Sequence, residues 1–292
     1  MNQGGSQGYG SGGYEPGGNS GGFGQGGGLR MPSLTPVVKH LILTNVVIFF
    51  LTFFLSFDDG VRRFVLDGLG LAPGLWRDWM PLVPVWQLLT YGFLHSLNGL
   101  SHLLFNMLGL YFFGTMLEAQ VGPRRFLVAY LMAVLVGGLL HLIVSLATGG
   151  SIPAVGASGG VLGVMVACAV LSPDTRVIVI MFPVKLKYLV GFLVAGDLFG
   201  ILVGLRDGGG DGVAHWVHLG GAIFGFLTVK RRWIWSDPVA KLEEKNAELK
   251  VERERAAELQ VDDLLVKIQK EGLGSLSKRE KEFLKKASKR KP

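Results

Sequence analysis

Long apolar stretches constrain the fold of this chain more than any other feature of its sequence. Between residues 37 and 230, six stretches lack the evenly spaced charges that would cover a helix in water. A bilayer core requires about 20 mostly apolar residues for each helix that spans it. The sequence therefore predicts six membrane-spanning helices, at Val38–Phe57, Ser101–Leu117, Phe126–Ala147, Ala157–Leu171, Tyr188–Gly204 and Val213–Val229.

The fourth predicted span, Ala157–Leu171, is unusually short. A short helix can begin below the membrane surface only where protein or a water-filled cavity lines the backbone that leads into it. Such an arrangement suits a reaction that needs water inside the membrane.

Charged residues make up only 17% of the chain, and they concentrate after residue 237. The sequence thus predicts an all-α integral membrane protein in three parts. Residues 1–36 form a Gly-rich cytoplasmic tail that we expect to be disordered, because glycine loses much backbone entropy on ordering. Residues 37–232 form the membrane domain, and residues 233–292 form a charged cytoplasmic helical tail.

The tail from Pro238 repeats leucine and alanine at near-heptad spacing, which predicts an amphipathic helix. Gly272 and Gly274 are expected to end it. Ser277 and Glu280 then form an S-x-x-E capping box, which predicts the start of a last short helix.

Lysine and arginine in short loops predict the orientation, because they gather on the cytoplasmic side. Ten lie on one side and four (Arg62, Arg63, Arg77 and Arg206) on the other; the ten are Arg30, Lys39, Arg124, Arg125, Arg176, Lys185, Lys187, Lys230, Arg231 and Arg232. Both termini are therefore predicted to be cytoplasmic. The net charge of +7 fits basic loops and a basic tail, and no nucleic-acid partner is expected.

The first 30 residues contain no apolar signal-peptide core, so we expect the internal spans to direct insertion. We predict a multi-pass protein of a bacterial plasma membrane. The sequence indicates no particular oligomeric state.

The segment Asp58–Leu100, between the first two spans, is rich in Gly, Pro and Trp and is still half apolar. It predicts a folded loop that lies in the membrane interface. Trp76, Trp79 and Trp86 suit that depth.

Ser158 and His218 are the first candidates for chemistry, since polar groups at membrane depth are expensive unless they serve a purpose. Each lies beside a G-x-x-x-G pair, which lets helix backbones pack closely; the pairs are Gly159/Gly163 and Gly221/Gly225. Contact between these two spans would bring the imidazole to the hydroxyl, and a serine is a weak nucleophile until a base takes its proton. The alternative is that each is an ordinary hydrogen-bonded packing residue.

His102 and Asn106 are four residues apart and share one face of the second span. Both can donate hydrogen bonds, and donors aimed at a developing oxyanion are often the largest catalytic contribution. A polar contact between helices is an equally acceptable interpretation of this pair.

These motifs together resemble the rhomboid family of intramembrane serine proteases. The resemblance covers residues 37 to 230 and rests on the segments His102-x-x-x-Asn106, Gly156-Ala157-Ser158-Gly159, Ala214-His215-x-x-His218-x-x-Gly221-x-x-x-Gly225 and Leu88-Leu89-Thr90-Tyr91-Gly92-Phe93-Leu94-His95.

The resemblance implies a six-helix bundle whose active site lies below the outer surface. Ser158 would be the nucleophile and His218 the general base, without an obligatory third acid. His102, Asn106 and the Ser158 backbone N–H would form the oxyanion hole. The substrates would be membrane proteins, cut in or near a transmembrane segment, with no metal and no cofactor.

The sequence departs from the family pattern at two places. Leu162 stands where many members carry an aromatic that packs on the catalytic imidazole, so His218 is expected to be held less firmly. Trp86-Gln87 stands where members often show Trp-Arg, which puts the internal contacts of the long loop in doubt.

Four further residues are weighed separately. Asp197 could orient His218, but a helix dipole, a backbone group or water is the favoured partner. A zinc site of His102, His215 and His218 is disfavoured, because no H-E-x-x-H signature is present and no Cys or Glu lies nearby. His141 and Cys168 are interpreted as structural.

Two other functions remain open at this point. A non-catalytic relative of the rhomboids could bind or escort membrane segments, although such proteins usually lose the serine or the histidine. A transporter would typically show internal repeats and charged sites at the midplane, and we find no repeat.

Overall fold

The computed structural model describes residues 32–97, 99–179, 181–207 and 213–288. These residues are mostly helical. Residues 1–31, which carry most of the predicted N-terminal tail, lie outside the described residues.

Each of the six predicted spans corresponds to a helix or to a continuous run of helices. The elements are α1 (Pro36–Leu55), α5 (Leu100–Gly109) continued by the π-helical turn η2 (Leu110–Gly114) and α6 (Thr115–Val121), α7 (Pro123–Thr148), α8 (Ser158–Leu171), α9 (Leu186–Asp207) and α10 (His215–Lys230).

Four of these helical segments are long and apolar enough to cross a membrane, and they make the chain an integral membrane protein by length and composition. They are Pro36–Leu55, Leu100–Val121, Pro123–Thr148 and Leu186–Arg206. α8 and α10 are shorter, with 14 and 16 residues. At 1.5 Å per residue they extend only about 21 and 24 Å, less than a hydrocarbon core of about 30 Å.

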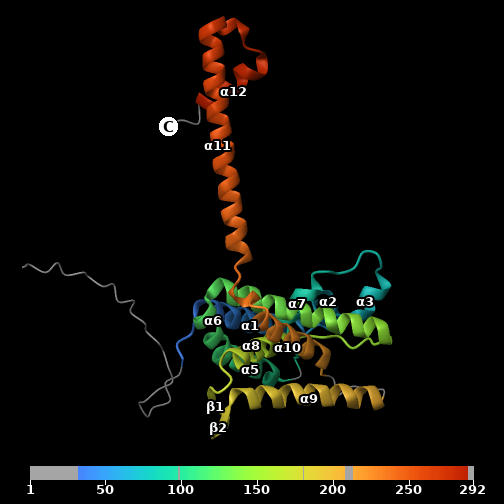
Figure 1. The fold of residues 1–292 in the computed structure, drawn as a ribbon. Helices are drawn as coiled ribbons and strands as arrows, with labels where there is room; N and C mark the ends of the chain where they lie inside the picture. Colours follow the sequence, from blue (N-terminus) through green and yellow to red (C-terminus); the bar gives the residue numbers. More distant parts are fainter. Residues whose placement is uncertain (1–31, 98, 180, 208–212, 289–292) are drawn as a thin grey trace, which may run out of the picture. The chain divides into compact units, whose positions relative to one another are not determined.

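α8 lies among α5, α6, α7 and α10 (Figure 1). Every residue of α8 from Gly159 to Ala169 is buried. A helix that is apolar on all sides must be surrounded by others, and the short α8 is the helix that this bundle encloses.

The long loop between the first two spans is folded, as expected. It contains α2 (Asp59–Leu69), α3 (Pro73–Asp78), α4 (Gln87–Thr90) and the 3-10 turn η1 (Tyr91–Phe93). Trp79 and Trp86 are about half exposed, as a position in the interface requires, whereas Trp76 is buried within the protein.

Gln87 provides the internal contacts of this loop. Its side chain is fully buried, and its Oε1 accepts hydrogen bonds from the Ala72 N–H (3.2 Å) and the Trp76 indole N–H (3.0 Å). Its Nε2 donates to the Asp67 carbonyl at 2.6 Å. The Gln87 amide therefore both accepts and donates hydrogen bonds. Because Gln87 stands where family members often carry Arg, the internal contacts of the long loop were in doubt, and the structure shows that they are made.

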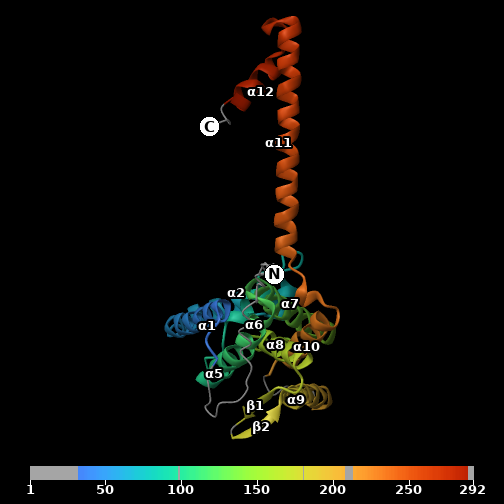
Figure 2. The ribbon, with the colours of Figure 1, turned by 60° about the vertical axis from the view of Figure 1, so that its left-hand side comes forward.

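The connection between α8 and α9 departs from an all-α fold. Strands β1 (Arg176–Val179) and β2 (Phe182–Lys185) pair antiparallel, with Arg176 opposite Lys185. The hairpin lies at the start of α9 (Figures 1 and 2). β-branched residues favour the strand, and the prediction treated this short run only as a loop.

The tail forms α11 (Pro238–Glu271), the 3-10 turn η4 (Leu273–Ser275) and α12 (Lys278–Ser288). Gly272 ends α11 with a φ of 81°, which glycine tolerates best. The predicted capping box is confirmed, because the Ser277 N–H donates to Glu280 (2.6 Å) and the Glu280 N–H donates to the Ser277 hydroxyl (3.3 Å).

Glu118 joins the start of the first span to the end of the second. This buried carboxylate accepts hydrogen bonds from the backbone N–H groups of Val37 (3.0 Å) and Val38 (2.9 Å) and from the Thr35 hydroxyl. The first N–H groups of a helix have no partner within it, so a residue 80 positions away caps α1.

Replacing Glu118 by Ala is expected to lower the free energy of unfolding by about 1–3 kcal/mol, because two buried N–H groups lose their acceptor. Thermal and denaturant unfolding of the purified full chain in detergent would measure this change. Gln120→Ala, an exposed position on the same helix, is the control. An equal loss in both variants would refute the capping role.

The hydrogen bonds of Glu280 are expected to make the stability of α12 depend on pH. The hydrogen bonds from Ser277, with a further contribution from Lys267, lower the pKa of Glu280 to about 2. A carboxyl whose pKa is lowered by folding stabilises the helix above its unfolded pKa and loses that effect as the pH falls. Protection of the α12 amides against hydrogen exchange should decline between about pH 4.5 and pH 2.

The matched variants are Glu280→Gln and Glu282→Gln, the latter at an exposed position of α12. Only Glu280→Gln should reduce protection at neutral pH and abolish the decline. Equal protection in the wild type and Glu280→Gln would contradict the prediction.

Candidate active site

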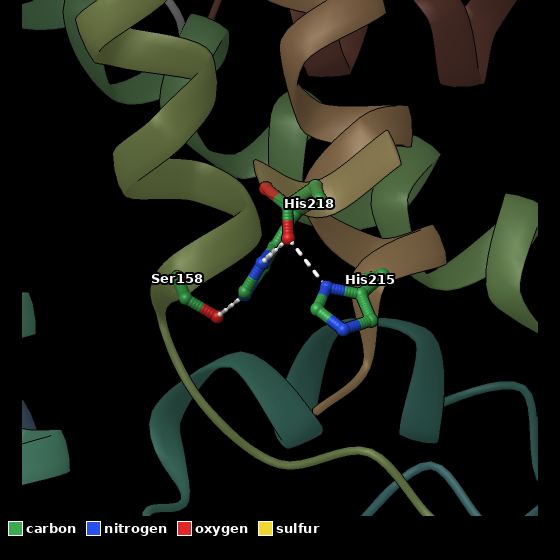
Figure 3. Close-up of polar contacts among 4 residues, drawn as sticks. Ser158, His215 and His218 are labelled. Atoms are coloured by element: carbon green, nitrogen blue, oxygen red, sulfur yellow. Dashed lines mark hydrogen bonds and ion pairs between the residues drawn. The ribbon is translucent and has the colours of Figure 1, made fainter. Parts of the chain in front are cut away.

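Ser158 and His218 meet, as the sequence predicts. Ser158 is the first residue of α8, and His218 lies in the first turn of α10. The Ser158 Oγ and the His218 Nε2 are 2.7 Å apart and form a hydrogen bond (Figure 3). The His218 side chain is 19% exposed, so it is largely enclosed and still reachable.

Close backbone packing of α8 and α10 produces this contact. A Cβ atom built on Gly221 would lie 2.0 Å from the Gly159 carbonyl oxygen, and one on Gly225 would lie 2.1 Å from the Gly163 oxygen. No side chain fits between the two helices at these points. Since 159 pairs with 221 and 163 with 225, the helices run in the same direction. α10 begins five residues, about 7.5 Å, before the level at which α8 begins.

The backbone leading into Ser158 is anchored to the long loop. Leu71 and Ala154 exchange two backbone hydrogen bonds (3.0 and 2.9 Å), and the Gly156 N–H donates to the Tyr91 carbonyl at 2.9 Å. Gly156 has a φ of 131°, a conformation that favours glycine. This anchoring fixes where α8 starts.

His102 lies beside the serine. A Cβ atom built on Gly156 would be 2.8 Å from the His102 Nε2 and 3.6 Å from the Ser158 Oγ, so Gly156 leaves room for the ring. Asn106, one turn further along α5, is buried, and its Nδ2 donates to the His102 carbonyl at 2.8 Å. The amide has a second N–H for another acceptor.

His95 supports His102 and was not singled out from the sequence. It is fully buried, and its ring centroid is 5.3 Å from that of His102. Burial, with a smaller effect of His102, lowers the pKa of His95 to about 4, so the ring is neutral at neutral pH. Its position seven residues before His102 was the available signal.

Asp197 contacts both histidines of α10. Its Oδ1 is 2.7 Å from the His218 Nδ1 and 2.7 Å from the His215 Nδ1 (Figure 3). The favoured interpretation of Asp197, as a partner of a helix dipole, a backbone group or water, is therefore wrong. Hydrogen bonds connect Ser158, His218 and Asp197 in series.

Within the described part of the chain, one group of side chains could hold a metal ion. It consists of Asp197, His215 and His218. One donor atom from each lies within 4.8 Å of the other two. The zinc site weighed from the sequence had His102 in place of Asp197. In this structure the Nδ1 atoms of His215 and His218 both contact the Asp197 carboxylate.

Leu162 is buried in the core of the bundle, four residues after Ser158. The ring nitrogens of His218 form hydrogen bonds with Ser158 and Asp197. His141, in α7, bonds to the Ile152 carbonyl at 3.0 Å, and Cys168 is buried beside the Phe113 carbonyl, as their structural interpretation predicts.

Comparison with known proteins identifies two matches to family models. Residues 84–233 match the family described as "Rhomboid domain". Residues 243–290 match a family of unknown function, DUF6576.

Three curated relatives illustrate the similarity. The chain is 30% identical over 151 residues to "Presenilin-associated rhomboid-like protein, mitochondrial" of Rattus norvegicus, covering 49% of this chain and 38% of the relative. It is 35% identical over 130 residues to "Rhomboid protein 1, mitochondrial" of Saccharomyces cerevisiae (43% and 36%). It is 33% identical over 143 residues to "Rhomboid protease GluP" of Bacillus subtilis (49% and 25%).

The chain thus spans less than two fifths of the length of these relatives. Two of them are mitochondrial and one is bacterial, so the predicted bacterial plasma membrane does not follow from the matches. A membrane location does follow from the helices.

Gly221→Ala is expected to separate α8 from α10, because the new Cβ would overlap a backbone oxygen that cannot move aside. The free energy of unfolding should fall by about 1–3 kcal/mol or more. Unfolding of the purified chain in detergent would measure it. Gly196→Ala, on α9, is the control, since a Cβ there meets nothing within 4 Å. Equal stability of the two variants would contradict the packing described.

Proposed function

The chain belongs to the rhomboid family, and we propose that it is a serine endopeptidase that cuts membrane proteins in or near a transmembrane segment. The observation that carries the proposal is the 2.7 Å hydrogen bond between the Ser158 hydroxyl and the His218 imidazole. One relative is named a rhomboid protease.

Ser158 acts as the nucleophile and His218 as the base. The His218 Nε2 takes the hydroxyl proton as the Ser158 Oγ attacks the carbonyl carbon of the scissile bond. The same nitrogen then gives that proton to the departing amine, which leaves an ester on Ser158. A water molecule hydrolyses the ester, with His218 again as the base, and the serine is restored.

The oxyanion that forms during attack is stabilised by three donors. As the first residue of α8, Ser158 has a backbone N–H without an intrahelical partner, and the positive end of the helix dipole adds to it. His102 lies beside Ser158, and Asn106 retains an N–H of its amide. Together they form the oxyanion hole.

In the proposed membrane arrangement, all six helical segments cross the bilayer. Six spans put both termini on one side, and the distribution of lysine and arginine favours the cytoplasm. α8 and α10 are shorter than the bilayer core. In the proposed arrangement Ser158 and His218, in the first turns of these helices, lie below the surface, where water must enter. The substrates are membrane proteins, and the reaction needs no metal and no cofactor.

Ser158→Ala and His218→Ala should each abolish hydrolysis, with a loss of about 1,000-fold or more, because the nucleophile or its base is removed. The measurement uses the purified full chain in detergent or nanodiscs with a fluorescent transmembrane substrate. Ser172→Ala, just after the end of α8, is the matched control and should retain activity.

Two outcomes would overturn the proposal. Stable binding of several substrates without cleavage by the wild type would favour a protein that escorts membrane segments. Cleavage that survives Ser158→Ala and stops with a chelator would favour a metal site at Asp197, His215 and His218.

A further inference from the structure

We infer that Asp197, held by His215, is a positioning residue that fixes the orientation and the tautomer of His218, an inference that rests on the proposed function. It adds a third and a fourth member to the serine–histidine pair. Asp197 lies on α9, and both histidines lie on α10.

The two ring nitrogens of His218 contact different partners. Its Nε2 is 2.7 Å from the Ser158 Oγ, and its Nδ1 is 2.7 Å from the Asp197 Oδ1. An ionised carboxylate only accepts hydrogen bonds, so the Nδ1 must carry the ring proton. The Nε2 then presents its lone pair to the serine, which is the form that a base requires.

Asp197 occupies an unusual place for a carboxylate. Its side chain is 10% exposed, in the middle of an apolar helix that is otherwise the least buried of the four long spans. A carboxylate at such a place is expensive unless it is satisfied, and it commonly has a function. Both imidazoles bind the same oxygen, Oδ1, so the carboxylate is directed at α10.

His215 holds the Asp197 carboxylate. The His215 Nδ1 is 2.7 Å from Oδ1, the same oxygen that His218 contacts (Figure 3). The His215 ring lies directly against the backbone of α9 at Gly200, where an added Cβ would be 2.2 Å from the His215 Nε2. Gly200 therefore provides the space for His215, and His215 provides a second hydrogen bond to the carboxylate.

His218 lies among side chains from four helices. It faces Ser158 from α8, Asp197 from α9, His215 from its own helix and the His102 ring from α5. Only Asp197 is acidic among these four. The tautomer of His218 is thus set by a single carboxylate, and a change of that carboxylate can be tested without touching the serine.

The experiment compares Asp197→Asn, Asp197→Glu and Gly200→Ala in the full chain, with Gly196→Ala as the matched control on the same helix. An Asn amide can donate to Nδ1 and so permits the Nε2–H tautomer. We expect Asp197→Asn to lower kcat about 100-fold with little change in KM, and Asp197→Glu to recover part of the loss. Gly200→Ala should lie between, and Gly196→Ala should match the wild type.

The second readout is independent of turnover. Ring 15N NMR of histidine-labelled protein, with His218 assigned by its Gln variant, reports which nitrogen carries the proton. The wild type should show His218 protonated at Nδ1, and Asp197→Asn should shift the proton toward Nε2. A loss of folding alone would not exchange one tautomer for the other.

The outcomes separate this inference from the proposed function. A wild type that cleaves, with Asp197→Asn equal to it in kcat and tautomer, overturns the inference and leaves the protease. A wild type that does not cleave, with a tautomer that depends on Asp197, refutes the protease and supports the positioning role. Bound zinc that Asp197→Asn releases, with activity lost to a chelator, overturns the positioning role.

Discussion

The direct contact between the backbones of α8 and α10 is the constraint on which the rest of the structure depends. Gly159 and Gly163 face Gly221 and Gly225 so closely that no side chain fits between them. This separation lets a serine on one helix and a histidine on the other form a hydrogen bond. Together with α10, the helices α5, α6, α7 and α9 contact α8. The backbone hydrogen bonds between Leu71 and Ala154 help to fix where α8 begins.

The sequence predicted the elements that follow from periodicity and from local chemistry. The six apolar stretches, the glycine pairs and the Ser277/Glu280 box each depend on residues close together in the chain, and the structure confirms the helices, the contact and the cap. Apart from the pairing of α8 with α10, it did not predict contacts that join distant residues. The partners of Asp197 depend on how α9 faces α10, and the acceptor for α1 lies 80 residues away. No local pattern encodes such pairings.

Hydrogen bonding to buried acidic and amide groups recurs throughout the bundle. Glu118, Gln87 and Asp197 are each buried, and each bonds to groups from another segment. In a medium without water, such a group is stable only when its partners are in place. At Asp197 this requirement has a chemical consequence. The hydrogen bonds of Asp197 to His215 and His218 bring the carboxylate to the imidazole that contacts Ser158.

The cap on α1 has a consequence for the order of assembly during synthesis. The N–H groups of Val37 and Val38 are made long before the ribosome reaches Glu118. Until Glu118 has been made, these N–H groups lack this acceptor, so the contact between the start of α1 and α6 cannot form. Completion of the second span supplies the carboxylate and closes the first helical hairpin. The hydrogen bonds from Val37 and Val38 to Glu118 therefore form only after the second span, which also bears His102 and Asn106, has been synthesised.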